Sequence, residues 1–530
     1  MKYLSKNSFE IKLYSMRIIK STLALFVFLI GFSAIAQVKV SKLFSDHMVL
    51  QRNQENPVWG TAKSGEKITV SIDGQKHKII ADSKGNWKVK LSPMKAGGPF
   101  EMKVKGKNKI VIEDILVGEV WICTGQSNMQ WSVINSNHSD IEIASANYPN
   151  IRLFSVPLVG STEKQTELGG DTSWLACTPE SIPEFSAAGY FFGRKLHQSL
   201  DVPVGLINAS WGASSLETWI ARDAMEATNE HTELLGDWDL AAAEFTDEKL
   251  AEVTRLYEEW EAAGKPGKKM RPARDIRIAQ NRPANAFNGV INPVLGYGIK
   301  GAIWCQGESN LGRGYQYRSL FPLLINSWRS SWGQGDFPFY WVQLASMKNP
   351  DIEPTTSSWA ELRESQTETL SLVNTGEVVT MDLGEGRDIH YRNKQPVGAR
   401  LARLALSKNY GFEIANESPR YESMEIKGDK IIITFNHIDE GLYAANFPEI
   451  NGFSISGEDQ KFVWADAKII NKNTIEISSD KISKPIAVRY AWSNYPNANL
   501  FDRNGLPVTG FRTDTWKLSS QDRKKAFRRY

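Results

Sequence analysis

The feature that most constrains the fold is a regular alternation of short apolar runs with helix-like segments between about residues 114 and 410. The apolar runs predict strands at Val120–Cys123, Val204–Asn208, Ala302–Cys305, Tyr340–Leu344 and Glu377–Met381. Helical spacing is found at Glu184–Leu200, Tyr315–Trp332, Glu361–Leu372 and Pro396–Leu406. Strands that alternate with helices form a parallel sheet with helices on both faces. We therefore expect an α/β domain over residues 114–410.

Two β regions are expected to flank this domain. In residues 37–113, apolar positions alternate along Ile68–Ile72, Asp73-Gly74 supplies a hairpin turn, and a second turn at Gly85-Asn86 leads into another alternating run. Residues 411–516 return to short strands, at Ile431–Phe435, Thr474–Ile477 and Pro485–Trp492. Residues 517–530 are predicted to be a solvated basic tail.

One segment does not fit the alternation of strands and helices in the α/β region. Asp247–Trp260 has apolar residues at helical spacing, and a basic stretch rich in glycine and proline follows it. We interpret residues 221–285 as a helical insertion into the α/β domain, and we expect it to overhang the functional site of that domain.

The first 36 residues have the pattern of an export signal. Met16, Arg17 and Lys20 form a basic start, Thr22–Phe32 is apolar, and Ala34-Ile35-Ala36 is a small-x-small cleavage site. Residues 1–15 would be an upstream extension, and the mature chain would begin near Gln37. The apolar run is too short for a membrane span. We therefore expect a periplasmic or extracellular protein that is not inserted in a membrane.

Cysteine usage and charge exclude several classes of protein. Three cysteines in an exported chain of 530 residues do not make a disulfide scaffold. Cys123 and Cys305 end predicted buried strands and should be buried, whereas Cys177 could be a surface thiol. A net charge of +3 is too small to indicate a nucleic-acid partner. No segment has metal-ligand spacing, so no metal and no cofactor are expected.

Polar residues follow the predicted strands at the points where they end. Ser127 lies in the segment TGQSNM, and Gly212, Gln306 and His390 follow later strands. The carboxyl ends of parallel strands share one edge of a sheet, so these residues should meet there. Serine, histidine and a carboxylate together suit nucleophilic acyl transfer, because the histidine activates the hydroxyl and the carboxylate orients the histidine. The Ser127 and Gly212 N–H groups and the Gln306 amide are candidate donors to the oxyanion.

The segments TGQSNM, NASWG, WCQGESN and DIHYRNKQPVGARLA resemble the sequence blocks of the sialate O-acetylesterase family within the SGNH (GDSL-like) hydrolases. The resemblance covers about residues 114–408. It implies an SGNH-type three-layer αβα domain and a metal-independent serine esterase that acts on O-acetylated sugars. By this resemblance Ser127 is the nucleophile, His390 the base, and Gly212 and Gln306 the second- and third-block oxyanion residues. Gln126, Asn128 and Glu308 are expected to support them.

The spacing between His390 and the acid that would orient it differs from that of the wider superfamily. There an aspartate commonly stands three residues before the histidine, but here position 387 is Arg387 and the acid is Asp388, two residues before. Residues two apart on an extended segment point to the same side, so Asp388 is the favoured acid. Glu308 and Asp382 are the alternatives.

The predicted function is release of acetate from an O-acetylated sugar, with O-acetylated sialic acid as the first candidate. Acetylxylan or another acetylated polysaccharide is the alternative substrate. A protein of another class, an inactive carbohydrate-binding protein that uses its aromatic-rich β regions, is the third hypothesis. Four arginines are candidates to bind a substrate carboxylate: Arg152, Arg313, Arg363 and Arg387.

Overall fold

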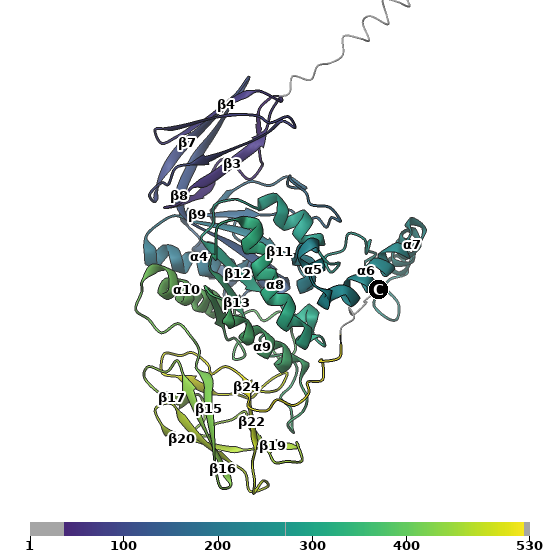
Figure 1. Ribbon diagram of the computed structural model, residues 1–530, viewed down its shortest axis with the longest axis vertical. Helices are drawn as coiled ribbons and strands as arrows, with labels where there is room; N and C mark the ends of the chain where they lie inside the picture. The colour runs from purple at the N-terminus through teal and green to yellow at the C-terminus, as the bar shows by residue number, and fades with distance from the viewer. Residues whose placement is uncertain (1–36, 271, 524–530) are drawn as a thin grey trace, which may run out of the picture. The chain divides into compact units, whose positions relative to one another are not determined.

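The computed structural model describes residues 37–270 and 272–523 (Figure 1). The predicted export signal, residues 1–36, lies outside the described residues. Contacts within the chain define two compact units. Among the described residues, the first comprises 37–40, Trp59–Val89 and Met102–Val111, and the second contains the others.

The strands of the N-terminal region are short and largely antiparallel. They are β1 (Lys39–Val40), β2 (Val49–Gln51), β3 (Asn56–Thr61), β4 (Lys67–Ile72), β5 (Gln75–Ile80), β6 (Asn86–Leu91) and β7 (Gly97–Lys105). The predicted hairpin turn is confirmed: β4 pairs with β5, and Asp73 and Gly74 between them have φ values of 46° and 73°. Positive φ at both central residues is what a type I′ turn requires. Strand β2 departs from the antiparallel prediction, because it pairs parallel with β8.

The predicted parallel sheet is present, in the strand order β10-β9-β11-β8-β12-β13-β14. Its members are β8 (Lys109–Gly125), β9 (Tyr148–Ser155), β10 (Leu175–Cys177), β11 (Val204–Ser210), β12 (Gly301–Cys305), β13 (Phe339–Val342) and β14 (Thr375–Val378). Neighbours are parallel except for the antiparallel edge strand β10. Strand β9 is not among the predicted strands, because proline, asparagine and arginine interrupt its apolar pattern.

Helices cover both faces of this sheet (Figure 1). Helices α4 (Ala187–Leu200) and α10 (Gln395–Tyr410) pack on the face that carries Ile303 and Cys305. Helices α8 (Gly314–Trp332) and α9 (Ser358–Glu368) lie on the other face, where Trp304 contacts Phe321 of α8 at a ring separation of 6.2 Å. The fold is therefore the predicted three-layer α/β arrangement.

The predicted insertion is helical, with α5 (Arg222–Glu226), α6 (Thr232–Ala243) and α7 (Asp247–Ala262). Helix α7 buries none of its residues. The part of the insertion that reaches the sheet edge is its return segment, where Gln280 Nε2 donates to Gly212 O at 3.4 Å. Two short helices, α2 (Ser127–Gln130) and α3 (Ser139–Ala144), lie earlier in the chain, after β8.

The C-terminal region forms small antiparallel sheets over an apolar core that includes Ile433, Phe453 and Ile477. The first sheet contains β15 (Arg420–Lys427), β16 (Lys430–Asn436), β21 (Thr474–Ser478) and β20 (Asp466–Asn471). The second contains β19 (Phe462–Trp464), β18 (Phe453–Ser456), β22 (Ala487–Tyr490) and β24 (Phe511–Arg512), and β17 (Leu442–Ala444) pairs with β23 (Leu500–Asp502).

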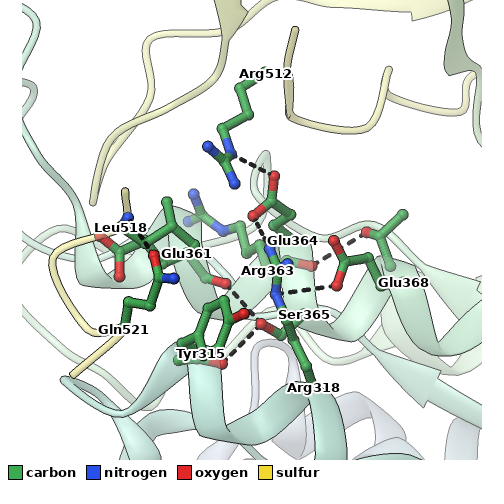
Figure 2. A network of polar contacts seen from close by, with 12 residues as sticks. Tyr315, Arg318, Glu361, Arg363, Glu364, Ser365, Glu368, Arg512, Leu518 and Gln521 are labelled. Carbon is green, nitrogen blue, oxygen red and sulfur yellow. Dashed lines mark hydrogen bonds and ion pairs between the residues drawn. The ribbon is translucent and has the colours of Figure 1, made fainter. Parts of the chain in front are cut away.

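The last described residues are anchored to α9 rather than solvated. Figure 2 shows the polar network at this junction, in which Arg512 donates to Glu364 at 2.7 Å. The Glu361 carboxylate accepts hydrogen bonds from the backbone and side chains of Ser519 and Ser520. The structure therefore differs from the prediction of a solvated tail from residue 517, because Leu518 and Ser520 are buried.

All three cysteines are buried and free. Burial of Cys123 and Cys305 agrees with the prediction, whereas the prediction of a surface thiol at Cys177 is wrong. Cys177 ends β10 and packs in the apolar core beneath α4. Within the described residues, no helix has the length and apolar character needed to cross a membrane.

Candidate active site

Three turns meet at the carboxyl edge of the sheet, around the central strand β8. The chain leaves β8 toward β9 on one side and later adds β12 on the other, so β8 ends at the point where the strand order reverses. Ligands of open α/β sheets bind at this position. Trp211 N donates to Gly125 O at 2.9 Å, and Gln126 N donates to Cys305 O at 2.8 Å. These bonds hold the turns after β8, β11 and β12 together.

Gly125 allows the tight approach between the first and third turns. Its φ is 127°, and a Cβ at this position would lie 2.2 Å from Cys305 O. Any other residue would both strain the backbone and collide with β12. Gln126 strengthens the same junction, because its Oε1 accepts from Gly307 N at 3.2 Å and from Ser309 N at 3.3 Å.

Ser127 begins the short helix α2 and is partly exposed. Among the described residues, neither its N–H nor its hydroxyl has a hydrogen-bond partner, and no bond joins it to His390. Catalytic hydrogen bonds often form only when substrate is bound. Ser127 lies beside the second turn, since a Cβ at Gly212 would be 3.7 Å from the Ser127 Cβ.

Asn128 connects the turn that carries Ser127 to the loop that carries His390. Its Nδ2 donates to Ile389 O at 3.0 Å and to Glu308 Oε1 at 2.6 Å, and its Oδ1 accepts from Lys394 Nζ at 2.7 Å. Residue 389 directly precedes His390, so this carboxamide holds the histidine loop against the turn that carries Ser127.

Lys394 was in a quoted motif but had no predicted role. Its side chain is buried, and the ammonium lies 3.4 Å from the centre of the Tyr391 ring. Burial lowers the pKa of Lys394 to about 8, although nearby acidic groups including Glu308 oppose the shift. A lysine whose ammonium is desolvated in this way is uncommon and here fixes the orientation of the Asn128 amide.

His390 contacts Asp388 and Trp131. Its Nδ1 lies 3.5 Å from Asp388 Oδ1, and the same oxygen accepts from the His390 backbone N–H at 2.8 Å. The Trp131 indole stacks on the imidazole, with ring centres 5.0 Å apart and planes 9° from parallel. Trp131 follows the TGQSNM segment by two residues, but an aromatic residue at a helix end carries no signal of this contact in the sequence.

The three candidate acids differ in their surroundings. The Asp382 carboxylate forms two hydrogen bonds to Arg400, at 2.8 and 2.7 Å, and so has another partner. Burial raises the pKa of Glu308, and its Oε2 is shielded from solvent without a partner among the described residues. Asp388 is the candidate with an oxygen near the imidazole nitrogen.

Two predicted oxyanion donors already have partners. Gly212 N donates to Gln130 Oε1 at 2.7 Å. The Gln306 amide donates to Asn310 Oδ1 at 2.7 Å and to Ser214 O at 3.2 Å, and its Oε1 accepts from the Tyr317 hydroxyl. The structure thus departs from the expected geometry of Gln306, because its amide hydrogens bind acceptors in the turns after β11 and β12.

The four candidate arginines differ in their partners and in their burial. Arg152 is paired with Asp114, and Arg313 with Glu217. Arg363 is buried among backbone carbonyls, and burial lowers its pKa to about 9. Arg387 is exposed beside Asp388 and has no partner among the described residues.

The sequence and the fold are similar to known carbohydrate esterases. Residues 281–407 match the family described as carbohydrate esterase, sialic acid-specific acetylesterase. The sialate O-acetylesterase of Mus musculus is 29% identical over 508 residues, which cover 86% of this chain and 90% of the relative. The sialate O-acetylesterase of Homo sapiens is 28% identical over 501 residues, covering 86% and 88%.

A solved structure extends the similarity to the whole architecture. The carbohydrate acetylesterase from Xanthomonas citri is 35% identical, with a TM-score of 0.78, and the match covers 90% of this chain and all of that one. The chain therefore belongs to the sialate O-acetylesterase family of carbohydrate esterases and is a carboxylic ester hydrolase that acts on O-acetylated carbohydrate.

Proposed function

We propose that this enzyme removes O-acetyl groups from sialic acid by covalent catalysis, with Ser127 as nucleophile, His390 as base and Asp388 as the orienting acid. The observation that carries the mechanism is the Asn128 bridge, which joins the turn of Ser127 to the loop of His390 at the switch point of the sheet.

In the first half-reaction, Ser127 Oγ attacks the acetyl carbonyl carbon while His390 Nε2 takes the hydroxyl proton. The tetrahedral intermediate collapses, the bond to the sugar oxygen breaks, and the imidazolium protonates that oxygen. Water then attacks the acetyl-enzyme by the same route, releasing acetate and restoring Ser127. Asp388 next to Nδ1 would stabilise the imidazolium in both halves.

The oxyanion needs donors where its charge develops. The Ser127 N–H supports this role, since it has no acceptor among the described residues. The Gly212 N–H can contribute only when Gln130 Oε1 releases it. We assign the Gln306 amide to holding the third turn in place.

Arg387 supports sialic acid as the acetylated sugar. It is the candidate arginine that is exposed without a partner in the described chain, and it lies in the catalytic loop. A guanidinium there can bind the sialic acid carboxylate in bidentate fashion. The relatives named sialate O-acetylesterase support the same substrate.

Acetate release from O-acetylated sialic acid, acetylated xylan and acetylated pectin tests the substrate. We expect the highest kcat/KM on O-acetylated sialic acid. Arg387→Ala should raise the KM for this substrate about tenfold, which is the order expected for loss of a charged hydrogen bond. Arg387→Lys should be intermediate, and Arg274→Ala, at an exposed arginine outside the loop of His390, is the matched control. Preference for xylan, with no effect of Arg387→Ala, would assign the acetylpolysaccharide alternative.

Ser127→Ala tests the mechanism independently of the substrate. Loss of the nucleophile should lower kcat at least about a thousandfold on any acetyl ester. A folded variant with near-normal turnover would refute serine catalysis here.

We also propose export, from the basic start, the apolar run and the cleavage site before Gln37. Mass spectrometry of the protein from its native cells should find a mature N-terminus near Gln37. An intact N-terminus on the cytosolic protein would contradict it.

A further inference from the structure

A small cavity lies in the C-terminal β region, outside the catalytic turns. Its volume is about 240 Å³, and its lining includes four aromatic residues, Phe453, Trp464, Trp492 and Tyr495. Trp464, at the end of β19, is 40% exposed, and its indole N–H donates to Ile352 O at 2.7 Å. This bond joins β19 to the segment that carries Asp351, which also lines the cavity.

Polar groups around this cavity lack partners. Asp351 Oδ2 and Ser493 Oγ are both shielded from solvent without a hydrogen bond among the described residues. The side-chain amides of Asn451, which is partly exposed, and Asn497, which is exposed, also line the cavity and form no hydrogen bond among the described residues. Buried polar atoms without partners are costly and call for an explanation. A ligand with several hydroxyl groups would satisfy both the acceptors and the donors.

The cavity is connected to the catalytic loop. Tyr495 lies against Gly386, where a Cβ would be 3.6 Å from the tyrosine ring. Met347 N donates to Asn494 O at 3.0 Å, and Lys348 N donates to Gly386 O at 3.0 Å. Gly386 is two residues before Asp388 in the sequence, so Tyr495 both lines the cavity and contacts the loop that carries Asp388 and His390.

We propose that this cavity is a subsite for a neutral sugar residue linked to the acetylated sugar. Aromatic side chains present apolar faces to the C–H side of a sugar ring, while the carboxylate and amides bind its hydroxyls. The volume is below the roughly 300–1,000 Å³ of sites for drug-sized ligands, which suits a single ring. The Asp351 carboxylate disfavours an anionic sugar here, because a like charge would lie beside it.

The subsite predicts that the enzyme prefers acetylated sugars within a glycan over free ones. It rests on the carbohydrate esterase activity and not on sialic acid being the acetylated sugar. The test therefore uses whichever acetylated sugar the wild type hydrolyses, free and linked to one neutral sugar. For sialic acid the neutral sugar is a hexose, and for xylan the pair is acetylated xylose and acetylated xylobiose.

We expect the wild-type kcat/KM to be at least about tenfold higher for the linked sugar, equivalent to about 1.4 kcal/mol. Trp464→Ala and Asp351→Asn should each reduce this preference toward unity, mainly through KM for the linked substrate. Asp351→Asn is nearly isosteric, so it tests the subsite even if Trp464→Ala disturbs folding, which thermal melting would reveal. Tyr443→Ala removes an exposed aromatic outside the cavity and should leave the preference unchanged.

Equal kcat/KM on linked and free sugars in the wild type would overturn the subsite, whichever sugar is acetylated. A linked-sugar preference that folded Asp351→Asn and Trp464→Ala both retain would also overturn it. A preference for xylan that both variants abolish would support the subsite while rejecting the sialic acid assignment.

Discussion

At the scale of single residues, the Asn128 side chain holds the candidate site together through hydrogen bonds. One carboxamide binds a backbone carbonyl of the histidine loop, the Glu308 carboxylate of the third turn and the Lys394 ammonium. Three partners from two segments leave the amide one orientation. The turn of Ser127 is therefore held against the loop of His390 without a direct bond between these two residues in the free enzyme.

The identity of the orienting acid is also decided at this scale. Asp388→Asn should lower kcat on the order of ten-thousandfold, because the carboxylate holds the imidazole tautomer and stabilises the imidazolium. Glu308→Gln keeps the acceptor for Asn128 and should cost less, and Asp382→Asn should disturb mainly the pair with Arg400. The measurement is kcat near neutral pH for the three variants in parallel. A loss below tenfold in Asp388→Asn, with a large loss in Glu308→Gln, would transfer the role to Glu308.

Gln306 shows how a buried amide can be structural within a catalytic motif. Gln306→Ala leaves Ser214 O without its donor, and it removes one of two donors to Asn310 Oδ1 and one of two acceptors of the Tyr317 hydroxyl, so it should lower the free energy of unfolding by about 1–3 kcal/mol. Urea denaturation measures this, with Gln198→Ala on the exposed side of α4 as control. Unchanged stability with kcat about a hundredfold lower would restore Gln306 as a direct oxyanion donor.

At the scale of elements, the turns after β8, β11 and β12 carry the candidate site residues Ser127, Gly212 and Gln306, and the helices pack behind them. Gly398 lets α10 approach α4 closely, since a Cβ there would lie 2.5 Å from Phe191 Cβ. Lys394 immediately precedes α10, so the packing of this helix also positions the Lys394 ammonium to bind Asn128. The position of the helix thus controls the orientation of a side chain beside the nucleophile.

Lys394 should make stability depend on pH. Its folded pKa of about 8 is below the ordinary value of 10.5, so between these values the unfolded chain binds more protons. This group's contribution therefore destabilises the fold fully below about pH 8 and is relieved as pH rises toward 10.5. Relative to Lys394→Met, the wild type should gain roughly 2–3 kcal/mol from pH 7 to pH 10.

Urea unfolding of both proteins at the two pH values measures that difference, and Lys195→Met, with a lysine on the surface of α4, is the control. A wild-type stability that falls relative to Lys394→Met over this range would contradict the assignment.

At the scale of the whole chain, α9 links the C-terminal segment to the α/β domain. Glu361 binds Ser519 and Ser520, while Arg363 in the same helix donates to Ser493 O at 2.9 Å beside the proposed sugar subsite. Helix α9 thereby binds both the C-terminal segment and Ser493, which lines the cavity.

Glu361→Ala should lower the free energy of unfolding by at least about 2 kcal/mol, because several buried hydrogen bonds to one carboxylate are lost. Glu368→Ala is the matched control in the same helix, because its ion pair with Arg318 is half exposed and worth about 0–1 kcal/mol. Thermal and urea unfolding measure both variants. Equal effects of the two substitutions would show that the buried contacts of the C-terminal segment add little to stability.

The sequence by itself determined the layer architecture, because strand and helix periodicities are local properties of apolar residues. It also placed Ser127, Gln306 and His390 at strand ends. Tertiary structure alone decided what those side chains contact. The bond from Gln306 to Ser214 O, the stacking of Trp131 on His390 and the burial of Lys394 and Cys177 join segments far apart in the chain. Such contacts depend on packing in three dimensions, which no local pattern of residues specifies.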